Sequence, residues 1–100
     1  MKVYHGTSPK AWEQIEREGL KGGCFATDPA FALMWQGADS IVVEVEGSRK
    51  MSLKGMRGER GLVCTAFELN EGETIPPEEL RRLTEDELVE HRKYLASLGR

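Results

Sequence analysis

The sequence predicts a single α+β domain in which a small, split, mixed or antiparallel β-sheet is flanked by helices. Two apolar runs, "SIVVEVEG" and "GLVCTAFELN", are rich in β-branched residues and typical of strands. Two stretches begin with a polar cap followed by proline, and a third begins with an S/T-x-x-E box; both patterns mark helix starts. One hundred residues suffice for one core. We therefore expect one domain over 1–100, with its core in 1–82 and a last helix over 84–98.

The first predicted elements are a short strand, Val3–Tyr4, and a helix over about Pro9–Glu18. Ser8 is a good N-cap, and proline suits the first helical position because its missing N–H is not needed there. Gly19 stands where a left-handed C-terminal cap is expected. The strand is thus expected to end at the His-Gly-Thr segment that leads into this helix.

A turn at Gly22–Gly23, a strand over Cys24–Ala26 and a second helix follow. The second helix begins at Pro29 and is capped by Thr27 or by Asp28. Its apolar composition, "AFALMW", predicts that it is mostly buried.

The remaining chain predicts two longer strands, a turn at "EGET", a short helical turn at "IPPEEL" and the last helix. That helix opens at the Thr84–Glu87 capping box. Segment 49–60 between the two strands holds five basic residues and one acidic residue, whereas the whole chain has a net charge of −3. We interpret this segment as a mobile basic loop that meets phosphates or an acidic partner, with an ordinary solvated loop as an equal alternative.

Composition and motif spacing argue against several classes of segment and binding site. The start of the chain lacks the apolar region of a signal peptide, and no apolar run approaches the roughly 20 residues of a membrane span. Cys24 and Cys64 form no CxxC pair, which argues against a zinc site and a disulfide framework and favours the reducing cytoplasm. The glycine-rich stretches match neither GxGxxG nor a P-loop. We expect no metal and no membrane partner.

Three spaced segments carry the functional signal: "YHGTS" at 4–8, "GGCFATDPAFALMW" at 22–35 and "TAFELNEGETIPPEEL" at 65–80. Their order and spacing resemble the ADP-ribosyltransferase fold family, which includes diphtheria-toxin-like transferases, poly(ADP-ribose) polymerases and RNA 2′-phosphotransferases. The resemblance covers residues 3 to about 80. It implies NAD as the substrate.

The resemblance also implies roles for individual residues. His5 would bond the adenosine ribose of NAD, the bare backbone of Gly6 would bond the nicotinamide amide, and Thr7 matches the hydroxyl residue that follows. Cys24 stands where the family usually has a tyrosine that stacks on nicotinamide. Trp35, eleven residues further on, would supply the second aromatic face, and Phe25 is the nearest substitute for the missing ring.

The third segment departs most from the family. Active transferases carry a glutamate on the strand before the "IPP" turn, and it stabilises the cation formed as nicotinamide leaves. Counting back from Ile75 places Ala66 at this position. Glu68 lies two residues on, on the same strand face, and is our catalytic candidate together with His5. Glu59, in the basic segment, is a second candidate.

The sequence thus predicts an NAD-dependent mono-ADP-ribosyltransferase that acts on a protein or nucleic-acid acceptor, recognised through segment 49–60. Such a small transferase would serve as a toxin, a phage-encoded effector or a housekeeping modifier. One alternative is a degenerate binding module that kept the scaffold without turnover, which the residues at positions 24 and 66 favour. A further alternative is RNA 2′-phosphotransferase chemistry, which requires arginines around a phosphate.

Overall fold

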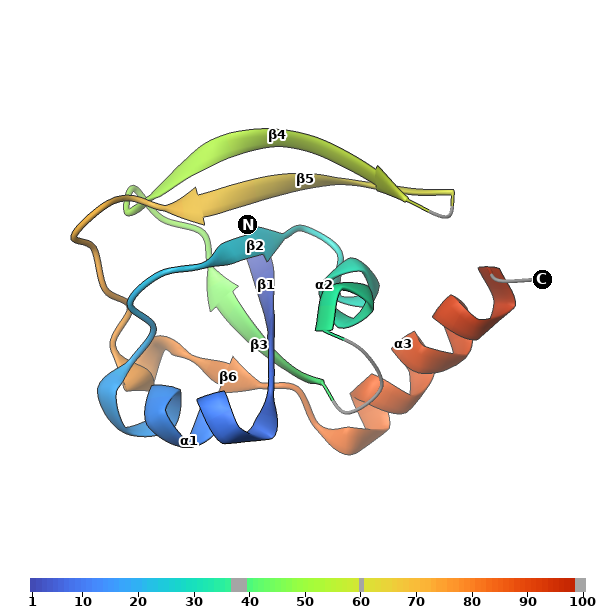
Figure 1. Ribbon diagram of the computed structural model, residues 1–100, viewed down its shortest axis with the longest axis horizontal. Coiled ribbons are helices and arrows are strands. Elements are labelled where there is room, and N and C mark those ends of the chain that lie inside the picture. Colours follow the sequence, from blue (N-terminus) through green and yellow to red (C-terminus); the bar gives the residue numbers. More distant parts are fainter. Residues whose placement is uncertain (37–39, 60, 99–100) are drawn as a thin grey trace.

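The protein is an α+β domain built on one antiparallel sheet, as Figure 1 shows for the computed structural model, which describes residues 1–36, 40–59 and 61–98. The strand order is β4-β5-β2-β1-β3-β6, with every pair antiparallel. The strands are β1 (Lys2–Thr7), β2 (Cys24–Ala26), β3 (Ile41–Glu46), β4 (Met51–Glu59), β5 (Leu62–Leu69) and β6 (Arg81–Arg82). The helices are α1 (Pro9–Glu18), α2 (Pro29–Gln36), α3 (Glu85–Leu98) and a 3₁₀ turn, Pro77–Glu79. The predicted α+β class is confirmed, and the sheet is antiparallel.

The sheet narrows in its middle. β1 and β3 pair through six residue pairs, and β2 and β5 through three, but β1 and β2 share only the pair Tyr4–Ala26. The predicted split is not confirmed, because the six strands form one continuous sheet; we call the weakly paired boundary between β1 and β2 the seam. On one side of the seam lie β4, β5 and β2, and on the other β1, β3 and β6.

The first strand is longer than the sequence indicated. β1 runs to Thr7, and His5, Gly6 and Thr7 pair with Val43, Val42 and Ile41 of β3. The expectation that the strand ends at His-Gly was wrong because β3 pairs alongside the whole tripeptide.

Helix caps follow the predicted chemistry. The Ser8 hydroxyl accepts a bond from the Ala11 N–H at 3.1 Å, and Asp28, not Thr27, caps α2 through a 2.8 Å bond from the Ala30 N–H. Gly19 ends α1 with φ +86° and ψ −179°, so its conformation is not the expected left-handed helical one. A β-carbon there would lie 2.4 Å from the carbonyl oxygen of Ile75, so the close approach of these two segments requires glycine.

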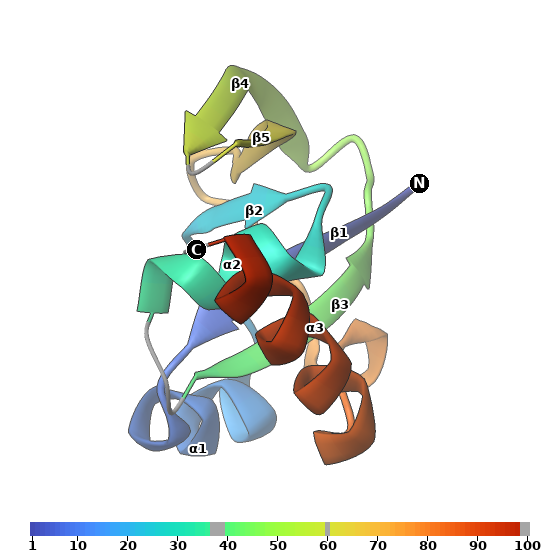
Figure 2. The same cartoon turned by 90° about the vertical axis from the view of Figure 1, so that its right-hand side faces the viewer.

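Two layers of apolar side chains cover the two sheet faces. On one face, Val3, Phe25 and Val43 pack with Trp12 of α1. On the other, Phe31 of α2 and Leu88 of α3 cover the sheet, and Figure 2 shows these two helices lying together on that side. Burial of both faces explains why Ile41–Val43 forms an unbroken apolar run.

Charged groups fix α3 to the sheet. Arg81 of β6 contacts Glu44 of β3 at 3.0 Å and Glu87 of α3 at 2.9 Å. Its guanidinium and the Thr84 N–H lower the pKa of the Glu87 carboxyl to about 2. The Glu87 N–H in turn donates to the Thr84 hydroxyl at 3.2 Å, which confirms the predicted capping box.

The interpretation of 49–60 as a mobile loop was wrong. Residues 51–59 form β4, which pairs with β5 over eight residue pairs and contains a bulge between Leu53 and Gly55. The bulge interrupts the period-two alternation that marks a strand, so the sequence pattern is weak even though β5 offers a full-length partner. Arg60 lies outside the described residues. None of the helices that the structure describes has the length and apolar composition of a membrane span.

Candidate functional site

The three segments singled out in the sequence lie on three adjacent strands. His5 is on β1, Cys24 on β2 and Glu68 on β5, and the sheet order places β2 between the other two. Cys24 and Glu68 are direct register partners. Continuing the register that pairs Tyr4 with Ala26 sets Gly6 beside Cys24 on the same sheet face.

His5 holds the seam together. Its Nδ1–H donates a 2.9 Å hydrogen bond to the carbonyl oxygen of Cys24, and its ring lies 5.4 Å from the Phe25 ring. Burial lowers the pKa of His5, and this effect outweighs the opposing influence of the bond to Cys24. The ring is therefore neutral at pH 7, with the proton on Nδ1 and a lone pair on Nε2. Within the described part of the chain, Nε2 has no hydrogen-bond partner.

The neighbouring predicted residues are largely covered. Thr7 is 5% exposed, and Gly6 is buried. Phe25 is fully buried in the core beside His5, so a nicotinamide ring would reach its face only if the seam opened. The side chain of Trp35 lies outside the described residues, and its predicted stacking role stays a prediction.

The carboxylate candidates occupy different positions. Ala66 is 1% exposed in the core and shares its sheet face with Glu68, whose side chain is 55% exposed. Glu59 pairs with Leu62 at the other end of the hairpin, six residues along β5 from Glu68 and therefore about 20 Å away. The structure thus brings Glu68 beside Cys24 and separates Glu59 from both.

Lys54 completes the group on this face. Its ammonium lies 3.8 Å from the Glu68 carboxylate and 3.5 Å from the Cys24 sulfur. A cavity of about 240 Å³ opens here, lined by Cys24, Lys54, Arg57 and Ala66. Sequence reasoning missed the two cations because they reach the site only through the pairing of β4 with β5. The sequence signal available for the bulge was Gly55, which directly follows Lys54, because glycine is common at bulges.

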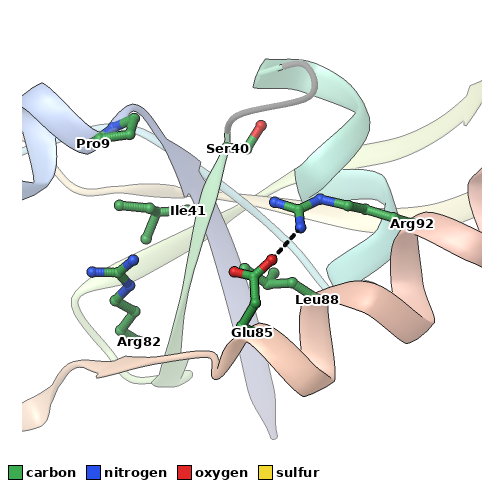
Figure 3. Close-up of a pocket in the computed structure, with 7 residues that line it drawn as sticks. All are labelled: Pro9, Ser40, Ile41, Arg82, Glu85, Leu88 and Arg92. Atoms are coloured by element: carbon green, nitrogen blue, oxygen red, sulfur yellow. Dashed lines mark hydrogen bonds and ion pairs between the residues drawn. The ribbon is translucent and has the colours of Figure 1, made fainter.

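A larger cavity, of about 650 Å³, lies where α1, β3, β6 and α3 meet (Figure 3). It is lined by Pro9, Ser40, Ile41, Arg82, Glu85, Leu88 and Arg92. Arg92 contacts Glu85 at 2.7 Å, while its Nε is buried and has no hydrogen-bond partner among the residues that the structure describes. No sequence motif marked this cavity, because its residues come from four separate segments.

Comparison with known proteins identifies no relative. No family model matches the chain, and no curated protein or solved structure matches it. Across the residues that the structure describes, no group of three or more His, Cys, Asp or Glu side chains is arranged to hold a metal ion.

Proposed function

We propose that the protein binds NAD at the seam between β1 and β2 and transfers its ADP-ribose group to an acceptor. The observation that carries this proposal is the position of His5, Cys24 and Glu68 on three adjacent strands around a seam held by one residue pair, with the His5 ring on the Phe25 face of the sheet and the Cys24 and Glu68 side chains on the opposite face. Cys24 and Glu68 lie 19 and 63 positions from His5 in the chain, yet the fold sets all three on neighbouring strands, and they are among the residues that the family resemblance singled out.

The protonation state of His5 suits a hydrogen bond from a ribose hydroxyl. A neutral imidazole with Nδ1 committed to the Cys24 carbonyl offers Nε2 as an acceptor, and a ribose hydroxyl is a donor of matching polarity. Gly6, on the adjacent position of β1, presents backbone without a side chain for the nicotinamide amide. Because Gly6 is buried, NAD binding requires the weakly paired seam to open.

We assign the assistance of bond cleavage to Glu68. In the proposed reaction, the bond between ribose C1′ and the nicotinamide nitrogen breaks, and nicotinamide leaves with the electron pair. The Glu68 carboxylate stabilises the resulting cation until a nucleophilic acceptor bonds to C1′ and loses its proton. The ion pair between Glu68 and Lys54 is exposed, and such pairs contribute only about 0–1 kcal/mol, so its rupture on NAD entry costs little.

A second candidate function is NAD binding without turnover. The observation that favours it is the pairing of Glu68 with Lys54, together with the buried alanine at the position matched to the family's glutamate. If the carboxylate stays with Lys54 when NAD is bound, the cation lacks its stabilising charge and the glycosidic bond survives.

Binding and nicotinamide release, measured separately, test both functions. NAD is titrated into the full chain by calorimetry, and release is followed by chromatography with and without a cell lysate as the source of acceptors. For the transferase, Glu68→Gln should keep NAD affinity and lower release by about 10²–10³-fold, the usual loss of one preorganised electrostatic group. Glu71→Gln, an exposed glutamate of the following turn, is the matched control.

The outcomes separate the candidates. NAD binding that weakens in His5→Ala but not in His91→Ala, with release that depends on Glu68, supports the transferase. The same binding without release supports the binding module. Absence of NAD binding at millimolar concentration refutes both.

A further inference from the structure

We infer that the cavity between α1, β3, β6 and α3 is a binding site for a small phosphate monoester with an apolar or aromatic body, of the size of a mononucleotide. This inference does not depend on NAD binding at the seam, because none of the residues that line this cavity belongs to the seam group.

Two arginines supply the charge. In Figure 3, Arg82 from β6 and Arg92 from α3 reach toward the cavity from opposite sides, and Glu85 lies between them. Arg82 has no ion pair within the described chain, in contrast to Arg81 beside it, which is held by two carboxylates. Two guanidinium groups against one carboxylate leave the cavity with a net positive charge.

The amino-terminal ends of two helices add to the positive charge of the cavity. α1 begins at Pro9 and α3 at Glu85, and both positions line the cavity. The amino-terminal ends of helices carry partial positive charge, which favours an anion between them. The buried Arg92 Nε–H, unpartnered among the described residues, is a further donor that a small shift of the side chain would deliver to a ligand.

The remaining walls and the volume favour an organic ligand over a bare ion. Pro9, Ile41 and Leu88 contribute apolar atoms to the lining beside the arginines, although Ile41 and Leu88 are only 4% and 2% exposed. A volume of about 650 Å³ falls within the range of small-molecule sites, which are mostly apolar with a few polar groups that fix orientation.

Glu85 indicates why the ligand is a phosphate monoester. Its carboxylate already occupies one donor of Arg92, at 2.7 Å, and its side chain is 70% exposed. A phosphate monoester carries about −1.5 to −2 charges at pH 7 and three acceptor oxygens. It can displace the exposed carboxylate and engage both guanidinium forks at once, whereas a simple carboxylate has only two oxygens and one charge.

Amide shifts of the ¹⁵N-labelled full chain test the inference. AMP, adenosine and inorganic phosphate are titrated in turn, and the amides of Ile41, Leu88 and Arg92 report on the cavity. AMP is expected to saturate these shifts, inorganic phosphate to produce them with lower affinity, and adenosine to leave them unchanged. Arg82→Gln should weaken AMP binding about tenfold, the effect of one charge-assisted contact.

Two variants sharpen the result. Glu85→Gln should tighten AMP binding severalfold because it removes the competing carboxylate, and Arg17→Gln, an exposed arginine of α1 outside the cavity, should change nothing. The inference is overturned if AMP does not saturate the cavity shifts, if adenosine binds as well as AMP, or if Arg82→Gln binds AMP like the parent. AMP shifts confined to His5 and Cys24 would also overturn it, while supporting a nucleotide site at the seam.

Discussion

Replacing Gly23 by alanine tests whether His5 is locked at the seam. Gly23 has φ +119°, a conformation that side chains rarely adopt, and a β-carbon there would lie 2.7 Å from His5 Cε1 and 3.2 Å from Nδ1. The ring cannot retreat freely, because it bonds the Cys24 carbonyl and packs on Phe25. Backbone strain of about 1–2 kcal/mol and loss of a hydrogen bond worth about 0.5–1.5 kcal/mol add to roughly 1.5–3.5 kcal/mol of destabilisation.

The neighbouring glycine provides the control. Within the described part of the chain, no atom beyond its two chain neighbours lies within 4 Å of the β-carbon position of Gly22, and its φ is not positive, so Gly22→Ala should change stability by less than about 1 kcal/mol. For a domain of this size, the Gly23→Ala loss corresponds to a fall in Tm of roughly 6–28 °C.

Urea unfolding and the His5 Nδ1–H proton signal measure the two effects. Gly23→Ala should unfold at lower urea and lose the slowly exchanging ring proton, and Gly22→Ala should keep both. If the two variants have equal stability and both retain the ring proton, His5 is not confined as the structure indicates.

Three further predictions concern pH, the last helix and the thiols. Burial holds the pKa of His5 below the ordinary value of about 6.5, so the unfolded chain binds that proton at a higher pH than the folded chain does. The free energy of unfolding should therefore fall as the pH drops below 6.5 and level off below the folded-state pKa of His5. Urea unfolding of His5→Asn should lack this component of the pH dependence. Thr84→Ala should cost about 1 kcal/mol because the α3 cap is lost, whereas Thr84→Ser, which keeps the hydroxyl, should unfold at nearly the parent urea concentration. Iodoacetamide should label Cys24 before Cys64, since Cys64 is 4% exposed and burial raises its thiol pKa; peptide mass spectrometry with equal labelling rates would contradict this.

The sequence by itself determined the local elements. Ser8–Pro9, Asp28–Pro29 and Thr84–Glu87 each carry their cap chemistry within four residues, so α1, α2 and α3 could be placed from neighbouring residues alone. The strand at Ile41–Glu46 was equally readable from its β-branched run. The grouping of the "YHGTS", "GGC" and "AFEL" segments came from a family resemblance, and the fold places them on neighbouring strands.

Tertiary structure alone decided the rest. β4 became a strand because β5 lies alongside it, and Lys54 meets Glu68 only through the bulge in that pairing. The cavity of Arg82 and Arg92 exists because β6 and α3 return to the beginning of α1. Helix caps and hydrophobic periodicity depend on residues within a turn of one another, so they can be recognised in one segment. Registers, bulges and cavities depend on contacts between distant segments, and the sequence of one segment does not show which other segment it will contact.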